Sequence, residues 1–152
     1  MIVRPVEKQD VSGVVELVRA TLAEFGITFG KGAKTDDQLR ELPESYTREG
    51  GAFFVAVDGD AVVGTAGVIP LQPGVFELRK MYLHPSTRGK GVGQQLFDSC
   101  LAHAKASRAT RIVLDTTHKM TSAIAFYERN GFVRDDAQIR ASRCSRGYRR
   151  DL

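Results

Sequence analysis

Apolar side chains recur along the chain with two different periods, and these periods predict where the helices and strands lie. Spacing of three to four residues predicts helices over Val11 to Phe25, Gly91 to Ser107 and Met120 to Asn130. We expect the first and the last to end at Gly26 and Gly131, because glycine readily adopts the backbone conformation that terminates a helix.

Shorter apolar runs between these helices predict strands. They are Ile2 to Val6, Phe53 to Val57, Val62 to Ile69, Val75 to Leu83, Arg111 to Asp115 and the segments from Phe132 onward. Asp58-Gly59-Asp60 is typical of a hairpin, and a turn is expected at Pro70 to Gly74. A short polar helix is expected over Asp36 to Leu42, after a glycine-rich stretch, Gly26 to Thr35, that we expect to be a mobile loop.

This order of elements predicts an α/β fold, an α+β mixed sheet with helices on both faces. A chain of 152 residues with 42% hydrophobic content buries one substantial core, so residues 1–152 are expected to form a single domain. No apolar run is long enough to span a bilayer, and the amino terminus lacks the apolar stretch of a secretory signal. We therefore expect a cytoplasmic protein without a membrane partner; a homodimer stays open.

The two cysteines, Cys100 and Cys144, form no CxxC pair and no cluster with histidine at metal-ligand spacing. The sequence therefore predicts neither a disulfide scaffold nor a metal site. Cys100 lies on the apolar stripe of its predicted helix, where a buried reduced thiol is expected.

A net charge of +4 and a pI of about 9.3 raise the question of a nucleic-acid partner. Most of the excess comes from the segment 134–152, which holds six Arg against three Asp. This segment has no aromatic interleaving beyond Tyr148 and no pattern of a docking helix. We expect no nucleic-acid partner, and a basic rim suits an anionic cofactor or substrate at least as well.

The segment Glu77 to Gly93 carries the clearest chemical signal. A predicted strand leads into a turn with glycines at three alternate positions, Gly89, Gly91 and Gly93, and then into an amphipathic helix. Glycines let a ligand approach the backbone closely, and the first N–H groups of a helix bind phosphate. With Arg88 and Lys90 beside it, the turn predicts a pyrophosphate site.

Two familiar phosphate-binding motifs do not fit this chain. A dinucleotide-binding strand–turn–helix needs GxGxxG, whereas Gly89, Gly91 and Gly93 give GxGxG. The stretch Gly26 to Gly32 imitates a GxxxxGK[ST] loop, but it has one residue too few and Gly32 where Ser or Thr is required.

The residues Arg88-x-x-Gly91-x-Gly93 match the Q/R-x-x-G-x-G/A signature of the GNAT acetyltransferase superfamily, which cradles the acetyl-CoA pyrophosphate. The block Ala123 to Phe132, a helix with Tyr127 followed by Gly-Phe, resembles the second conserved block of that family. The resemblance implies a central, mostly antiparallel twisted sheet and contacts of acetyl-CoA with a set of residues in these blocks. These are Met81, Tyr82, Leu83, Arg88, Gly89, Lys90, Gly91, Val92, Gly93, Gln94, Met120 and Tyr127. Many members carry Asn where this chain has Met120, which removes a side-chain hydrogen bond to the pantetheine arm.

The same resemblance implies a role for single residues. The strand before the turn bulges, so Met81 and Leu83 would bind the pantetheine arm through their main chains, with one N–H polarising the thioester. Independently, Arg79 and Lys80 are expected on opposite faces of this central strand, and two buried charges there need a reason.

Tyr127 would protonate the departing thiolate, and the alternative is a Tyr that only packs. Glu77 would accept the amine's proton, and the alternatives are a carboxylate that binds substrate or a residue facing outward. His84 and His118 are fallback bases.

The sequence therefore predicts an enzyme, an N-acetyltransferase that moves acetyl from acetyl-CoA to a primary amine on a small molecule by direct attack in a ternary complex. The early helices with the loop Gly26 to Thr35 would form one wall of the acceptor site, and Arg143 to Arg150 the other. An Arg-lined wall would suit an acceptor that also carries an anionic group. Two other classes stay open, a non-catalytic acyl-CoA sensor of the same fold and a nucleic-acid-binding module.

Overall fold

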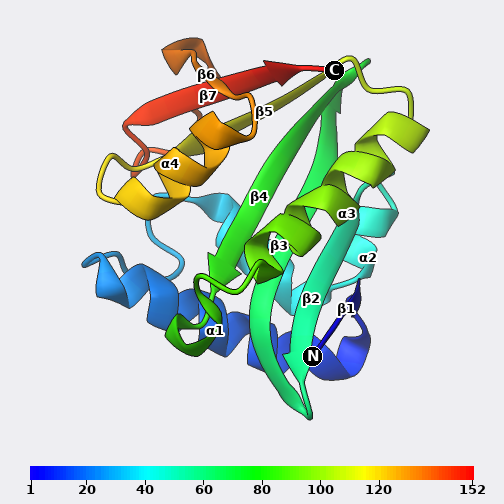
Figure 1. Cartoon of the computed structure of the whole chain (residues 1–152), viewed down its shortest axis with the longest axis vertical. Helices are drawn as coiled ribbons and strands as arrows, with labels where there is room; N and C mark the ends of the chain where they lie inside the picture. The colour runs from blue at the N-terminus through cyan, green and yellow to red at the C-terminus, as the bar shows by residue number, and fades with distance from the viewer.

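The computed structural model describes all 152 residues and centres on one seven-stranded sheet of order β1-β2-β3-β4-β5-β7-β6 (Figure 1). The strands are β1 (Ile2–Pro5), β2 (Ala52–Asp58), β3 (Ala61–Gln72), β4 (Val75–Leu83), β5 (Arg111–Thr116), β6 (Val133–Arg134) and β7 (Arg146–Asp151). Every neighbouring pair is antiparallel except β4 and β5. The predicted mixed, mostly antiparallel sheet is confirmed.

The one parallel pair is also the shortest contact at the centre of the sheet. β4 pairs with β5 only from Val75 to Glu77, opposite Arg111 to Val113. Beyond Glu77 the two strands diverge, as Figure 1 shows, so the second half of β4 has no strand on that side. Its backbone N–H and C=O groups are therefore available there to a ligand.

Helices cover both faces of the sheet. They are α1 (Val11–Glu24), α2 (Glu44–Thr47), α3 (Val92–Ala106) and α4 (Thr121–Arg129), with short 3₁₀ segments at Lys8–Asp10, Lys34–Glu41, Pro85–Thr87 and Asp136–Gln138. The side chains of α1, α2 and the Lys34–Glu41 segment join one buried cluster, and those of α3 and α4 join another on the opposite face. No helix is both long and apolar enough to cross a bilayer.

The predicted helical stripes are the surfaces that pack on the sheet. On α1, Val14, Val18 and Leu22 are fully buried, and on α3 the same holds for Leu96 and Phe97. Each such side chain stabilises the fold by roughly 1.5–3 kcal/mol relative to an exposed one. Cys100 is buried on the same face of α3, as its position on the apolar stripe predicted.

Three local predictions need correction. The polar helix expected at Asp36 is a 3₁₀ segment, and α2 was not expected at all. β3 runs on to Gln72, so the turn expected over Pro70 to Gly74 is confined to Pro73 and Gly74. Only Val133–Arg134 forms a strand between α4 and Arg146, because the chain between them makes a 3₁₀ turn at Asp136–Gln138 and irregular loops.

Candidate active site

β4 contains a bulge at the point where it leaves β5. Arg79 pairs with Gly67 of β3 and Tyr82 pairs with Thr65, so two residues of β4, Lys80 and Met81, face the single residue between them on β3. Lys80 has a φ of 55°, in the left-handed region that residues other than glycine seldom adopt. The extra residue reverses the alternation of side chains along the rest of the strand.

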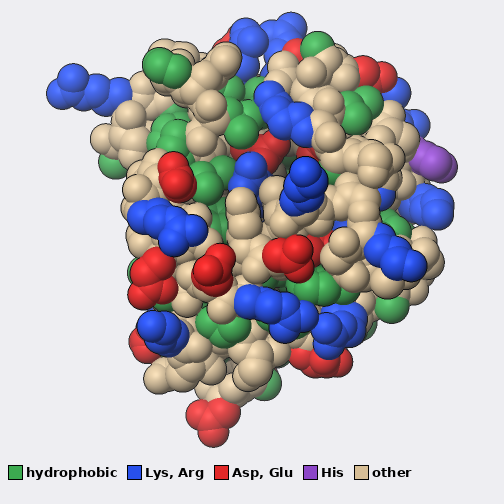
Figure 2. All heavy atoms as spheres, turned by 180° about the vertical axis from the view of Figure 1, so that it is seen from behind, with side chains coloured by type: hydrophobic (Ala, Val, Ile, Leu, Met, Phe, Trp, Pro, Cys, Tyr) green, Lys and Arg blue, Asp and Glu red, His purple; other side chains and the backbone are tan.

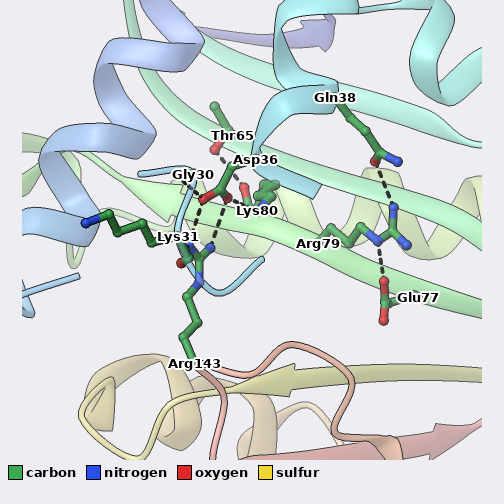
Figure 3. Close-up of polar contacts among 9 residues, drawn as sticks. All are labelled: Gly30, Lys31, Asp36, Gln38, Thr65, Glu77, Arg79, Lys80 and Arg143. Carbon is green, nitrogen blue, oxygen red and sulfur yellow. Dashed lines mark hydrogen bonds and ion pairs between the residues drawn. The ribbon is translucent and has the colours of Figure 1, made fainter. Parts of the chain in front are cut away.

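The bulge overturns one expectation about the strand. Arg79 and Lys80 do not point to opposite faces, since both reach the 3₁₀ segment Lys34–Glu41 on the α1 side (Figure 3). Arg79 donates to Gln38 Oε1 at 3.0 Å, and the Lys80 ammonium is paired with the Asp36 carboxylate. After the bulge, Tyr82 packs on the α1 side, while Met81 and Leu83 pack towards α3 and α4.

The glycine turn before α3 has the geometry of an anion site. Gly89 and Gly91 have φ values of 77° and 81°, and Gly91 is the N-cap of α3. A side chain added at either position would meet no atom within 4 Å, so the space over the turn is open. The N–H groups of the first turn of α3, from Val92 to Gln94, face no earlier helical carbonyl and suit a phosphate there.

The side chain of Arg88, the first residue of the signature, is bound to other protein groups. Its guanidinium donates two bonds to the Glu24 carboxylate, each of 3.0 Å, and two more to the Leu83 carbonyl at 3.2 and 3.0 Å. Lys90, by contrast, has no ion-pair partner. Of the two cations expected at the turn, Lys90 alone has no ion-pair partner, although it is Arg88 and not Lys90 that lines the cavity beside the turn.

Two cavities open on either side of the diverging strands and share part of their lining. The first, which we name the turn cavity, has a volume of about 620 Å³ and runs from the glycine turn to α4. The second, the sheet cavity, has a volume of about 730 Å³ and lies between β4, β5 and the segments 30–35 and 140–144. Both are lined by the same four residues, Met81, Tyr82, Met120 and Tyr127. The cavities therefore meet at the bulge and at Tyr127.

Tyr127 lies at this junction on α4. Its side chain is 7% exposed, and its hydroxyl makes no hydrogen bond with a protein group. Its ring packs edge-on against Phe132, and the ring of Tyr148 lies 6.5 Å away, centre to centre. Burial raises the pKa of the Tyr127 phenol above its ordinary value, so the hydroxyl keeps its proton and can donate it.

Glu77 lies in the sheet cavity and is 4% exposed. Its carboxylate is paired with the Arg79 guanidinium and lies 3.5 Å from Arg140 Nη1. The expected alternative of an outward-facing strand residue is therefore wrong. His84 and His118 line neither cavity and bond instead to Ser86 and Ser145.

Asp36 is a buried residue of this region that the sequence did not reveal. It has no exposed surface, and it accepts bonds from Arg143 at 2.7 and 3.0 Å, from the Gly30 N–H at 2.8 Å and from Lys80 (Figure 3). Burial alone would raise the pKa of this carboxyl, but the bonds from Arg143 and the charge of Lys80 hold the pKa below its usual range. An isolated Asp in a polar segment gives no sequence signal of such a role.

The sheet cavity carries an excess of positive charge. Its lining includes Lys34, Arg79, Lys80, Arg140 and Arg143 against Glu77 and Asp115. Asp115 accepts the backbone N–H groups of residues 140 and 141 at 2.7 and 2.9 Å, which fixes that segment over β5. Of the tail arginines expected in this wall, Arg143 lines the cavity, whereas Arg149 pairs with Asp135 and Asp151.

The face of the molecule seen from behind mixes both signs of charge. Figure 2 shows basic and acidic side chains interspersed over this face, with no continuous basic stripe. No group of three or more His, Cys, Asp or Glu side chains is placed to hold a metal ion.

Comparison with known proteins identifies the family of the chain. A family model described as the acetyltransferase (GNAT) family matches residues 16–132, so the chain belongs to this family and is by class an acyltransferase. It is 35% identical over 135 residues to the uncharacterized N-acetyltransferase YjgM of Escherichia coli (strain K12), covering 86% of this chain and 81% of that protein. It is 33% identical to N-acetyltransferase 8B of Homo sapiens over 62% of this chain, and spans 44% of that longer protein.

Solved structures show the same fold. An acetyltransferase of the GNAT family from Staphylococcus aureus Mu50 superposes with a TM-score of 0.91 at 24% identity, over 99% of this chain and 98% of that one. The PaiA N-acetyltransferase from Thermoplasma acidophilum, solved in complex with coenzyme A, superposes with a TM-score of 0.76 at 17% identity, over the same shares of the two chains. The predicted GNAT fold is confirmed.

Proposed function

We propose that this protein transfers the acetyl group of acetyl-CoA to the primary amine of a small molecule that also carries an anionic group. The observation that carries the proposal is the junction of the two cavities at Met81 and Tyr127. One cavity ends at an anion-binding turn and the other is lined by charged side chains. Donor and acceptor can therefore meet in one ternary complex, and the amine attacks the thioester directly.

The turn cavity would hold the donor. The N–H groups at the start of α3 and Lys90 would bind the pyrophosphate, with Gly89 and Gly91 allowing close approach. The pantetheine arm would lie along the half of β4 that has no strand partner on the β5 side, against the main chains of Met81 and Leu83. The Met81 N–H would then polarise the thioester carbonyl and stabilise the oxyanion that forms on attack.

Tyr127 would supply a proton to the leaving thiolate. A thiol has a pKa of about 8.5, so the leaving thiolate is a good proton acceptor as its charge develops. Burial raises the pKa of the Tyr127 phenol, which keeps a proton on the hydroxyl at neutral pH but also makes the phenol a weaker acid, so we propose that the proton is donated only as the thiolate departs. The hydroxyl has no protein partner to compete for its proton, and it lies where the two cavities meet.

Glu77 would remove the proton that the acceptor must lose before attack. An amine with a pKa of about 10 is almost entirely ammonium at neutral pH. The Glu77 carboxylate faces the sheet cavity while it is held by Arg79, so we propose that a water relays the proton to it. The positive lining of the same cavity, Lys34 and Arg140 above all, would bind an anionic group on the acceptor.

The test is release of free thiol from acetyl-CoA in the presence of amines offered in pairs, with and without a carboxylate or phosphate. We expect turnover with the anionic member of at least one pair and a higher KM for its neutral partner. Binding of acetyl-CoA without turnover on any amine would favour the alternative of an acyl-CoA sensor. Unchanged CoA affinity in a folded Gly91→Asp variant, with Gly91→Ala as the control for backbone strain, would overturn the donor site.

A further inference from the structure

The left-handed conformation of Lys80 needs support from its surroundings, because a residue with a Cβ atom is strained there. Two buried contacts supply it. The Asp36 carboxylate binds the ammonium of Lys80, and the Thr65 hydroxyl donates to its carbonyl at 2.7 Å. Asp36 and Thr65 both have no exposed surface, so neither contact competes with solvent.

Asp36 is itself held from three directions. Besides the Lys80 ammonium, it accepts bonds from Nη1 and Nη2 of Arg143 and from the Gly30 N–H (Figure 3). Arg143 also donates to the Lys31 carbonyl at 3.3 Å. Asp36 is therefore tied to both walls of the sheet cavity and to the bulge, and its position is fixed independently of Lys80.

Met81 directly follows Lys80 and has no register partner on β3 or β5. The direction of its N–H therefore depends on the backbone of Lys80. We propose that Asp36 is a positioning residue for acetyl transfer: it fixes Lys80 in the bulge and so aims the Met81 N–H at the thioester carbonyl. This inference rests on the proposed placement of the thioester at Met81.

A purely structural ion pair is the competing interpretation, and Asp10 offers a matched control for it. Asp10 is also buried, accepts two bonds from Arg4 at 2.8 and 3.0 Å and one from the Glu7 N–H at 2.8 Å, and lines neither cavity. Asp10→Asn and Asp36→Asn each remove one buried, multiply bonded carboxylate charge. Asp36→Asn is expected to destabilise the fold more, because Asp36 pairs with two largely buried cations and Asp10 with one partly exposed arginine, so the free energy of unfolding is measured for both variants. Only Asp36→Asn touches the bulge.

The experiment uses acetyl-CoA labelled with ¹³C at the acetyl carbonyl, and follows its carbonyl stretching frequency on binding. In the wild-type protein we expect a shift to lower frequency, because a hydrogen bond polarises the carbonyl. In Asp36→Asn the shift should fall to less than about half of its wild-type size, and kcat should fall by about 10- to 100-fold. CoA affinity should stay within about threefold of wild type. Asp10→Asn should keep the shift and the kcat.

Thr65→Val, which removes the second contact to Lys80 with little change in volume, should lower both readouts in the same direction. It also tests the proposal if Asp36→Asn does not fold. No shift in the wild-type protein would show that the thioester does not lie at Met81, which is a failure of the proposed function. A normal wild-type shift that survives in the folded Asp36→Asn variant, or an equal loss in Asp10→Asn, would overturn the role of Asp36 alone. A shift that survives in Thr65→Val would show that the Met81 N–H does not depend on the support of Lys80, which removes the basis of the proposal.

Discussion

The Arg88 guanidinium forms a two-bond ion pair with the Glu24 carboxylate and ties the end of α1 to the end of β4. Both side chains are partly exposed, so the pair itself contributes at most about 1 kcal/mol to stability. Its main consequence is that the guanidinium is engaged, while Lys90 beside the same turn is free.

Arg88→Gln and Lys90→Gln each remove one positive charge next to the glycine turn. We expect Lys90→Gln to weaken CoA binding by about 3- to 10-fold, with a smaller dependence on salt than in the wild type. Arg88→Gln should weaken CoA binding by less than about threefold, because the Arg88 side chain is already bound to Glu24 and Leu83. Calorimetry at two salt concentrations measures both, and the reverse order would show that Arg88 leaves Glu24 to bind the phosphate.

Tyr127→Phe should lower kcat by about 10²- to 10⁴-fold and leave CoA affinity nearly intact, because it removes the proton donor and keeps the ring. The melting temperature should change little, since the hydroxyl bonds to no protein group. Tyr148→Phe is the matched control, a neighbouring buried Tyr whose hydroxyl is also without a partner and which lines neither cavity. A full kcat in Tyr127→Phe would mean that Tyr127 only packs.

Glu77→Gln separates two roles of the carboxylate. If Glu77 is the base, the variant should be slow at neutral pH. Its activity should recover partly as the pH approaches the pKa of the acceptor amine, about 10, because the amine is then largely deprotonated without a base. If Glu77 binds the ammonium group, KM should rise with kcat little changed. Steady-state kinetics across this pH range decides between them, and we expect the first outcome. A kcat that equals the wild-type value at every pH would exclude Glu77 from catalysis.

The ion pairs of Asp36 should make the stability of the protein depend on pH in the acid range. The pKa of the Asp36 carboxyl in the folded protein lies below the ordinary value of 3.8, so its contribution to stability is complete above that value and is lost as the pH falls through the lower, folded pKa. Asp36→Asn should therefore have a lower free energy of unfolding than the wild type at neutral pH. The difference between the two free energies should become smaller below about pH 4. Chemical denaturation at a series of pH values measures this difference. A difference that does not change with pH would show that the ion pairs of Asp36 do not stabilise the folded protein.

Local sequence determined most of the helices and strands and the residues of the proposed donor site. The apolar stripe of α3 and the glycines before it lie within a few residues of one another, and so do Tyr127 and its Gly-Phe continuation. Helix periodicity, left-handed glycines and free N–H groups depend on neighbours in the chain, so they can be predicted before the fold is known.

Tertiary structure alone decided which charged residues pair around the two cavities. Lys80 and Asp36 lie 44 residues apart, Asp36 and Arg143 lie 107 apart, and Arg88 and Glu24 lie 64 apart. The sequence marked Lys80 as a buried charge and Arg88 as a residue of the glycine turn, but it gave no sign that Asp36 or Glu24 would be their partners, because only the fold brings them together. The bulge at Lys80 likewise follows from the register of β3 against β4, which no local pattern encodes, and it puts Arg79 and Lys80 on one face where strand alternation predicted two.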